Sequence, residues 1–204
     1  MLLIGICGAS GSGKSTLARE IAQRVEGQAL ILAQDVYYQD HPDMPFEERE
    51  KLNYDEPAIF EHDQVFSDLS ALKNGQAISR KGYDYAQHRR QDPGTPMGPA
   101  DVVLFEGIHA FYDPRVRELC DFKIFMRVDP DICLLRRAQR DIEKRGRTIE
   151  GIARQYLATV KPMYDKYVRN YIDYADIIVA GGGKNARIAD VLAFYINRGG
   201  LKAE

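Results

Sequence analysis

This sequence of 204 residues has only three cysteines, no long apolar run and no large excess of either positive or negative charge. Cys7, Cys120 and Cys133 are too far apart for a C-x-x-C motif, so we expect neither a disulfide framework nor a zinc site, and we predict that they fill the core. No apolar run approaches the roughly 18 residues of a membrane-spanning helix, and no signal peptide is recognisable. With 28 basic and 30 acidic residues, the chain has no global positive field to hold nucleic acid. We therefore expect a cytoplasmic protein without a membrane or nucleic-acid partner.

Short apolar runs recur along the chain, bounded by Gly, Asp or Pro. We expect them to be buried strands, at residues 2–7, 29–33, 102–105, 122–128 and 176–180. Continuous apolar runs, rather than strict alternation, are typical of parallel strands that are covered on both faces. Together with the helical patterns between them, they predict an α/β fold: a doubly wound, mostly parallel sheet with helices on both faces, in one domain spanning residues 1–204.

The helical patterns between these runs lie at residues 14–26, 61–73, 130–145, 149–171 (with an irregularity at Pro162) and 186–196. Two stretches, 39–57 and 79–99, interrupt the alternation of strands and helices and are rich in proline and charged or aromatic residues. Segments of that length inside a compact domain are usually lids or binding segments, or else disordered. We predict that both contribute to substrate binding.

One motif of high specificity follows the first apolar run directly and precedes a helical pattern. It fits G-x-x-x-x-G-K-[ST], the phosphate-binding loop, or P-loop. Its glycines let successive backbone N–H groups converge on phosphate oxygens, and the helix adds its positive N-terminal end. We expect Lys14 to neutralise the β- and γ-phosphates and the Ser15 hydroxyl to bind Mg²⁺. The nucleotide-binding residues predicted here are Gly8, Ala9, Ser10, Gly11, Ser12, Gly13, Lys14, Ser15 and Thr16.

Two acidic residues follow apolar runs, where the carboxyl ends of parallel strands place a reactive centre. Asp35 comes after the second run and Glu106 ends the third. We assign Asp35 to the hydroxyl of the phosphoryl acceptor, as general base, and Glu106 to the metal ion. The alternatives are that Asp35 is an ordinary helix N-cap and that Glu106 is a surface acid at a strand end.

Arginine is concentrated between residues 127 and 147. Arg136, Arg140 and Lys144 recur every fourth position and would fall on one face of a helix. A solvated, ion-paired helix face is the simpler interpretation. A lid over residues 136–150 that closes on triphosphate would also require such a face, because guanidinium groups offer bidentate donors to phosphate. A kinase with an arginine-rich lid is therefore predicted.

The chain resembles the uridine kinase family, also called uridine–cytidine kinase, along almost its whole length, through the order and spacing of its remaining motifs. No single motif after the P-loop is specific, but their order and spacing are. They are Asp35-Val36-Tyr37-Tyr38, Asn53-Tyr54-Asp55-Glu56-Pro57-Ala58, Tyr83-Asp84-Tyr85 with His88 and Arg90, Phe105-Glu106-Gly107-Ile108, Arg136-Arg137, Arg140-Asp141-Ile142, Arg145-Gly146-Arg147, Gln155-Tyr156, Lys161-Pro162 and Tyr174-Ala175-Asp176-Ile177-Ile178.

The resemblance implies a fold of the P-loop NTPase type and phosphorylation of the 5′-hydroxyl of uridine or cytidine, with ATP or GTP as donor and Mg²⁺ as cofactor. Asp35 resembles the family's catalytic general base, which acts on the ribose 5′-hydroxyl. Arg140 and Arg145 are expected on the triphosphate side of the lid. Asp55 with Arg137 resembles the pair that binds the ribose 2′- and 3′-hydroxyls. The remaining nucleoside contacts implied are Tyr83 and His88 at the pyrimidine edge, Tyr85 near the base, Arg147 and Gln155.

Tyr54 stands where the family has Phe, and Glu56 stands where His is common. These departures leave the choice between uridine and cytidine open. The alternatives from sequence are a related P-loop kinase acting on another acceptor, as phosphoribulokinase and pantothenate kinase do, and a nucleotide-binding regulatory module without transfer chemistry. The family also implies a homo-oligomer, a tetramer, which the residues alone do not determine.

Overall fold

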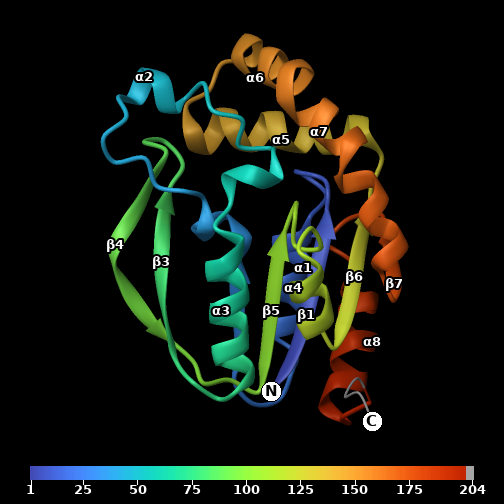
Figure 1. Ribbon diagram of the computed structural model, residues 1–204. Helices are drawn as coiled ribbons and strands as arrows, with labels where there is room; N and C mark the ends of the chain where they lie inside the picture. Colours follow the sequence, from blue (N-terminus) through green and yellow to red (C-terminus); the bar gives the residue numbers. More distant parts are fainter. Residues whose placement is uncertain (201–204) are drawn as a thin grey trace.

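The computed structural model describes residues 1–200, and its centre is a five-stranded parallel sheet (Figure 1). The strands are β1 (Leu2–Gly8), β2 (Ala29–Ala33), β5 (Val102–Gly107), β6 (Phe122–Arg127) and β7 (Ile177–Ala180), in the order β2-β5-β1-β6-β7. All five predicted strands are confirmed. Strands β1 and β5 are buried along their whole length, which explains their unbroken apolar sequences.

Helices cover both faces of this sheet, as predicted. On one face, α1 (Lys14–Ala22) and α8 (Ala186–Asn197) pack Leu17, Ile21 and Leu192 onto the strands. On the other, α3 (His62–Lys73) and α4 (Pro114–Leu119) join a 3₁₀ segment, Val168–Tyr174, around Phe105 and Phe111. The fold is therefore a three-layer α/β arrangement.

The predicted helices match α3, α5 (Pro130–Arg145) and α8 closely, whereas the others differ. Helix α1 ends at Ala22, four residues early, and the short helix α4 was not expected. The predicted helix 149–171 is broken into α6 (Ile149–Gln155), a π-helical turn (Tyr156–Val160), α7 (Lys161–Lys166) and the 3₁₀ segment. Pro162 removes one backbone donor from this run, which accounts for part of the irregularity.

Residues 79–99, predicted as a substrate-binding segment without an assigned strand or helix, contain most of a β-hairpin. Strands β3 (Ile78–Asp84) and β4 (Arg89–Met97) pair antiparallel and stand apart from the central sheet, beside α3 (Figure 1). Only Ile78 of β3 is fully buried, so its sequence lacks the apolar periodicity that marks a strand. Residues 39–57 are mostly irregular, with one short helix, α2 (Phe46–Arg49).

The three cysteines are buried free thiols, as predicted. Within residues 1–200, no helix has both the length and the apolar composition to span a membrane. The carboxyl ends of the strands point toward α5 and α6, and the hairpin tip and α2 approach the same end (Figure 1). This arrangement gathers the P-loop, both strand-end acids and the arginine-rich helix at one edge of the sheet.

Candidate active site

The P-loop connects the end of β1 to the start of α1. Gly11 and Gly13 have φ of 85° and 95°, which L side chains rarely adopt, and a Cβ on either would collide with the backbone of residue 133 or 183. The Lys14 ammonium bends back over the loop and donates to the Ala9 carbonyl at 2.9 Å. The loop therefore presents a lysine and the open N-terminal turn of α1 to the same solvent-open cavity, named the phosphate cavity here.

Ser15 and Glu106 meet in this cavity. The Ser15 hydroxyl donates to Glu106 Oε1 at 2.7 Å, and Glu106 is only 8% exposed. Burial, together with the neighbouring Asp35, raises the pKa of Glu106, against the opposing effects of Lys14 and Ser15. A buried carboxylate beside a hydroxyl suits a hard cation such as Mg²⁺, which takes a few protein oxygens and completes its shell with water and phosphate. Within residues 1–200, no group of three or more His, Cys, Asp or Glu is placed to hold a metal ion.

Asp35 lies where two cavities meet. It lines both the phosphate cavity and a second, neighbouring cavity, and its Oδ2 accepts a hydrogen bond from the Tyr85 hydroxyl at 3.0 Å. It belongs to a 3₁₀ turn, Gln34–Tyr37, whose N-cap is Ala33 and which no side chain caps. Asp35 is therefore not the ordinary N-cap considered above, and its carboxylate faces the junction between the cavities.

Helix α5 forms one wall of the phosphate cavity. Arg136, Arg140 and Lys144 all line this cavity, so the predicted common face exists. Arg145 lines it too and lies over the Tyr85 ring, with its guanidinium carbon 4.2 Å from the ring centroid. Tyr85, which was expected beside the pyrimidine ring, thus contacts both Asp35, the candidate general base, and Arg145 of α5.

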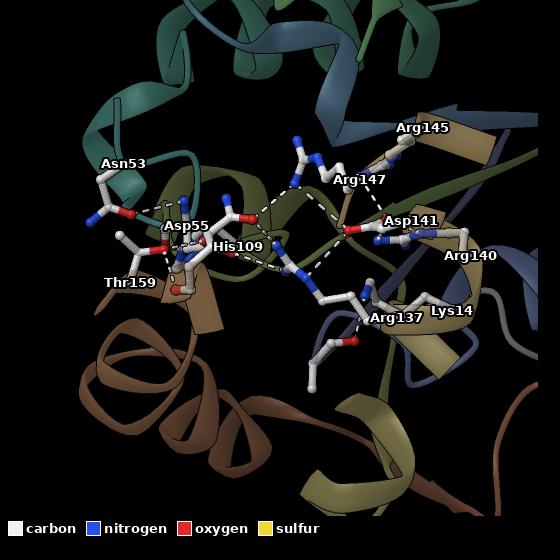
Figure 2. A network of polar contacts seen from close by, with 12 residues as sticks. Lys14, Asn53, Asp55, His109, Arg137, Arg140, Asp141, Arg145, Arg147 and Thr159 are labelled. Atoms are coloured by element: carbon white, nitrogen blue, oxygen red, sulfur yellow. Dashed lines mark hydrogen bonds and ion pairs between the residues drawn. The ribbon is translucent and has the colours of Figure 1, made fainter. Parts of the chain in front are cut away.

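Asp141, which sequence reasoning left without a role, is at the centre of the arginine cluster (Figure 2). It is fully buried, and its Oδ1 accepts a hydrogen bond from Arg140 Nε at 2.9 Å and forms an ion pair with Arg145 at 3.2 Å, while its Oδ2 faces Arg137 at 3.6 Å and Arg147 at 3.7 Å. Burial alone would raise the pKa of Asp141, but the hydrogen bond from Arg140 and the surrounding positive charges hold it below its usual value. The carboxylate is therefore ionised across the physiological range.

The second cavity is where the predicted nucleoside residues come together. Its lining includes Asp55, Tyr83, Tyr85, His88, Arg137, Arg147 and Gln155, from five separate segments. Gln155 Oε1 accepts from both Arg137, at 2.9 Å, and Arg147, at 2.8 Å. Tyr38 and Tyr54 also line this cavity and were not among the predicted site residues.

His88 lies at the turn of the hairpin, with φ of 48°, and stacks on Tyr54 at 4.4 Å between ring centroids. Burial, followed by the charges of Arg147, Arg145 and Arg49, lowers the pKa of His88 to about 4, so the ring is neutral at pH 7. Its Nδ1 and the Tyr83 hydroxyl are buried without a hydrogen bond of good geometry to any described residue. Such atoms are suited to a polar ligand edge.

Asp55 is 6% exposed, and residues that the sequence analysis missed hold it in place (Figure 2). Thr159 donates to its Oδ2 at 2.9 Å, and Arg137 lies 3.6 Å from its Oδ1. The ring of His109 joins the Asp55 carbonyl, 2.7 Å from Nε2, to the Tyr171 hydroxyl, 2.9 Å from Nδ1. A carbonyl only accepts, so Nε2 carries the proton and Nδ1 accepts from Tyr171.

Burial lowers the pKa of His109 to about 4, although its contact with Asp55 acts in the opposite direction. Because the unfolded chain takes up this proton near pH 6.5, the folded state is favoured above that pH and loses this contribution as the pH falls toward 4. The expected loss is at most about 1.4 kcal/mol per pH unit for one histidine. Urea unfolding from pH 7 to pH 4.5 should show a shallower pH slope for His109→Phe than for the wild type, whereas parallel curves would refute this effect.

The Phosphoribulokinase / Uridine kinase family matches residues 3–187, which is most of the chain. The chain belongs to this family. It is 50% identical over 194 residues to the uridine kinase of Leuconostoc citreum (94% of this chain and 92% of that protein) and 42% identical over 195 residues to that of Staphylococcus aureus (95% and 94%). Family membership makes the protein a P-loop kinase, an enzyme that phosphorylates a hydroxyl group.

Solved structures that are more distant in sequence share the fold. Phosphoribulokinase from Rhodobacter spheroides superposes with a TM-score of 0.63 at 14% identity, over 92% of this chain and 74% of that one. D-glycerate 3-kinase from Cryptococcus neoformans gives a TM-score of 0.53 at 15% identity, over 88% and 86%. The predicted P-loop NTPase type of fold is confirmed.

Proposed function

We propose that this kinase transfers the γ-phosphoryl group of ATP or GTP to the 5′-hydroxyl of uridine or cytidine, giving UMP or CMP. The observation that carries the proposal is the position of Asp35, in the lining of both the phosphate cavity and the cavity that holds Asp55, Tyr83 and His88. An acceptor in the second cavity would present its hydroxyl to Asp35 and to a phosphate on the P-loop together. The uridine kinases similar to this chain support the choice of acceptor.

Phosphoryl transfer depends mainly on positioning and on stabilising charge. Asp35 would orient the acceptor hydroxyl and take its proton. Lys14 and the lid arginines Arg140 and Arg145 would neutralise the phosphate oxygens while the lid, residues 136–150, excludes water. Ser15 and Glu106 would hold Mg²⁺, which supplies further neutralisation of the triphosphate when bound.

The nucleoside would lie in the second cavity. Asp55, oriented with Arg137, offers carboxylate oxygens to two vicinal hydroxyls, and Arg147 and Gln155 would complete the ribose side. Tyr83 Oη and His88 Nδ1, which accept or donate no hydrogen bond of good geometry among residues 1–200, would bind the edge of a pyrimidine, with Tyr54 and Tyr85 providing ring contacts. Residues 39–57 and the hairpin 79–99 would thus serve as the nucleoside-binding segments of a single kinase domain, residues 1–204.

The test is Mg²⁺-dependent ADP formation from ATP, measured alone and with uridine, cytidine, adenosine, ribulose 5-phosphate or pantothenate. Stimulation confined to pyrimidine nucleosides supports the proposal and ranks the two bases. Stimulation by another acceptor would keep the kinase but overturn the roles of Asp55, Tyr83 and His88. No stimulation, with GTP as well as ATP, would favour a regulatory nucleotide-binding module.

We further propose a cytoplasmic homo-oligomer, a tetramer, whose small-molecule partners are the nucleoside and the nucleoside triphosphate. Val191, Phe194 and Tyr195 lie at i, i+3 and i+4 on α8 and are 50–53% exposed, an apolar helix face that an interface would cover. Light scattering after size exclusion should report a mass near four times 23.1 kDa, and a mass near 23.1 kDa would refute the tetramer.

A further inference from the structure

The helix that follows the lid contains a π-helical turn, Tyr156–Val160, between α6 and α7. The Lys161 N–H donates to the Tyr156 carbonyl, five residues back, which is the bond that defines such a turn. Pro162 has no N–H to give to the carbonyl four residues earlier, so an ordinary helical ladder could not continue here. Single π turns inside helices are frequent at functional sites.

This turn directs Thr159 at the candidate ribose acid. Its hydroxyl is 2.9 Å from Asp55 Oδ2 and 3.1 Å from the Gln155 carbonyl of its own helix. One hydroxyl has one proton, and the charged carboxylate is the stronger acceptor, so the proton goes to Asp55. Leu157, in the same turn, points away and is 70% exposed.

The Asp55 carboxylate has few other restraints. Arg137 approaches Oδ1 only to 3.6 Å and donates to Gln155 instead. Asn53 and His109 contact the main chain of Asp55, not its carboxylate. Within residues 1–200, Thr159 makes the one hydrogen bond to this carboxylate that has a normal length. Its removal would free the carboxyl plane to rotate.

We infer that Thr159 is a positioning residue that sets the specificity of the enzyme for an acceptor with vicinal hydroxyls. By fixing Oδ2, it keeps Oδ1 and the remaining lone pair of Oδ2 directed into the cavity, at the two places where neighbouring hydroxyls can donate. The inference rests on the proposed function, and it adds a residue that contacts no substrate itself. Thr159 and Gln155 are four residues apart on one helix face, so the same helix orients both Asp55 and the two arginines that Gln155 binds.

The experiment compares the wild type, Thr159→Val and Thr159→Ser with uridine and with 2′-deoxyuridine. Valine matches threonine in shape but cannot donate. We expect Thr159→Val to lower kcat/KM for uridine by about 10-fold or more, in the range of a hydrogen bond to a charged group. The loss for 2′-deoxyuridine should be smaller, so the ratio of the two kcat/KM values shrinks. Thr159→Ser should restore both values to within about threefold of the wild type, because the donor returns.

Two measurements separate this specificity effect from general damage. The KM for ATP and the melting temperature should stay close to wild type, and Leu157→Ala, in the same turn, should leave the nucleoside ratio unchanged. An unchanged ratio in Thr159→Val, or an equal loss for both nucleosides, overturns the role of Thr159 while the proposed function stands. A wild type that phosphorylates no pyrimidine nucleoside overturns the proposed function, and this assignment with it.

Discussion

Asp35→Asn is expected to lower kcat about 10²- to 10⁴-fold, the usual contribution of a general base, while the protein still binds ATP. The amide keeps the size of the side chain and can still accept the Tyr85 hydrogen bond, but it cannot take the proton of the acceptor. The nucleotide-binding groups, Lys14 and Ser15, have their own partners, Ala9 and Glu106, and do not depend on Asp35. Steady-state ADP production measures the first effect, and calorimetric titration with a non-hydrolysable ATP analogue measures the second.

Tyr85→Phe is the matched control for this experiment. It removes the hydrogen bond to Asp35 but keeps the carboxylate and the ring beneath Arg145. Its kcat should fall less than that of Asp35→Asn, by about tenfold, because one hydrogen bond to a charged group is lost while the carboxylate that takes the proton remains. Loss of nucleotide binding in Asp35→Asn, or a kcat within a few-fold of wild type, would contradict the role assigned to Asp35.

The sequence predicted most reliably what depends on local pattern. The parallel strands appear as apolar runs because both faces of the sheet are covered, and the P-loop appears because its glycines are needed for backbone conformation. The hairpin was missed because, among the described residues of its strands, the buried apolar ones are confined to Ile78 and Met97, at one end of the hairpin. Such strands leave no apolar alternation to detect.

The second part of the site depends on contacts that no local pattern records. Thr159 lies 104 residues from Asp55, and His109 lies 54 residues from it. A lone threonine in a helix or a histidine after a strand is typical of many ordinary surroundings. Only the fold shows that both hold the same acid.

In the sequence, Asp141 is one of several acidic residues among the arginines. Nothing in the sequence indicates that four arginines contact its carboxylate. The prediction of a solvated, ion-paired helix face is partly right, and the lid stays a prediction. The arginines do form ion pairs, yet their common partner is a fully buried carboxylate on the same helix. An acid in this position organises the cluster rather than merely neutralising it.

Asp141→Asn should lower kcat/KM about 100-fold for ATP and for the nucleoside alike. A loss of this size is typical when groups that position a substrate are misplaced by about 1 Å. Oδ1 binds Arg140 and Arg145, which line the phosphate cavity, whereas Oδ2 faces Arg137 and Arg147 of the nucleoside cavity. Without the negative charge, the four guanidinium groups repel one another and lose the ion-pair partner that they share. Stability should fall by about 2–3 kcal/mol, less than for a fully buried pair because Arg140 is 36% exposed and therefore solvated.

Steady-state kinetics with each substrate varied in turn, together with urea unfolding, test this expectation. Glu143→Gln is the control, since it removes an exposed acid from the same helix and should change neither measurement appreciably. The pattern also distinguishes Asp141 from Thr159. Because Asp141 contacts arginines of both cavities, its loss should affect ATP and the nucleoside alike, whereas loss of the Thr159 hydroxyl should affect the nucleoside alone. A variant at Asp141 that impairs only one substrate would show that the two pairs of arginines are positioned independently, and that this carboxylate does not link the two halves of the site.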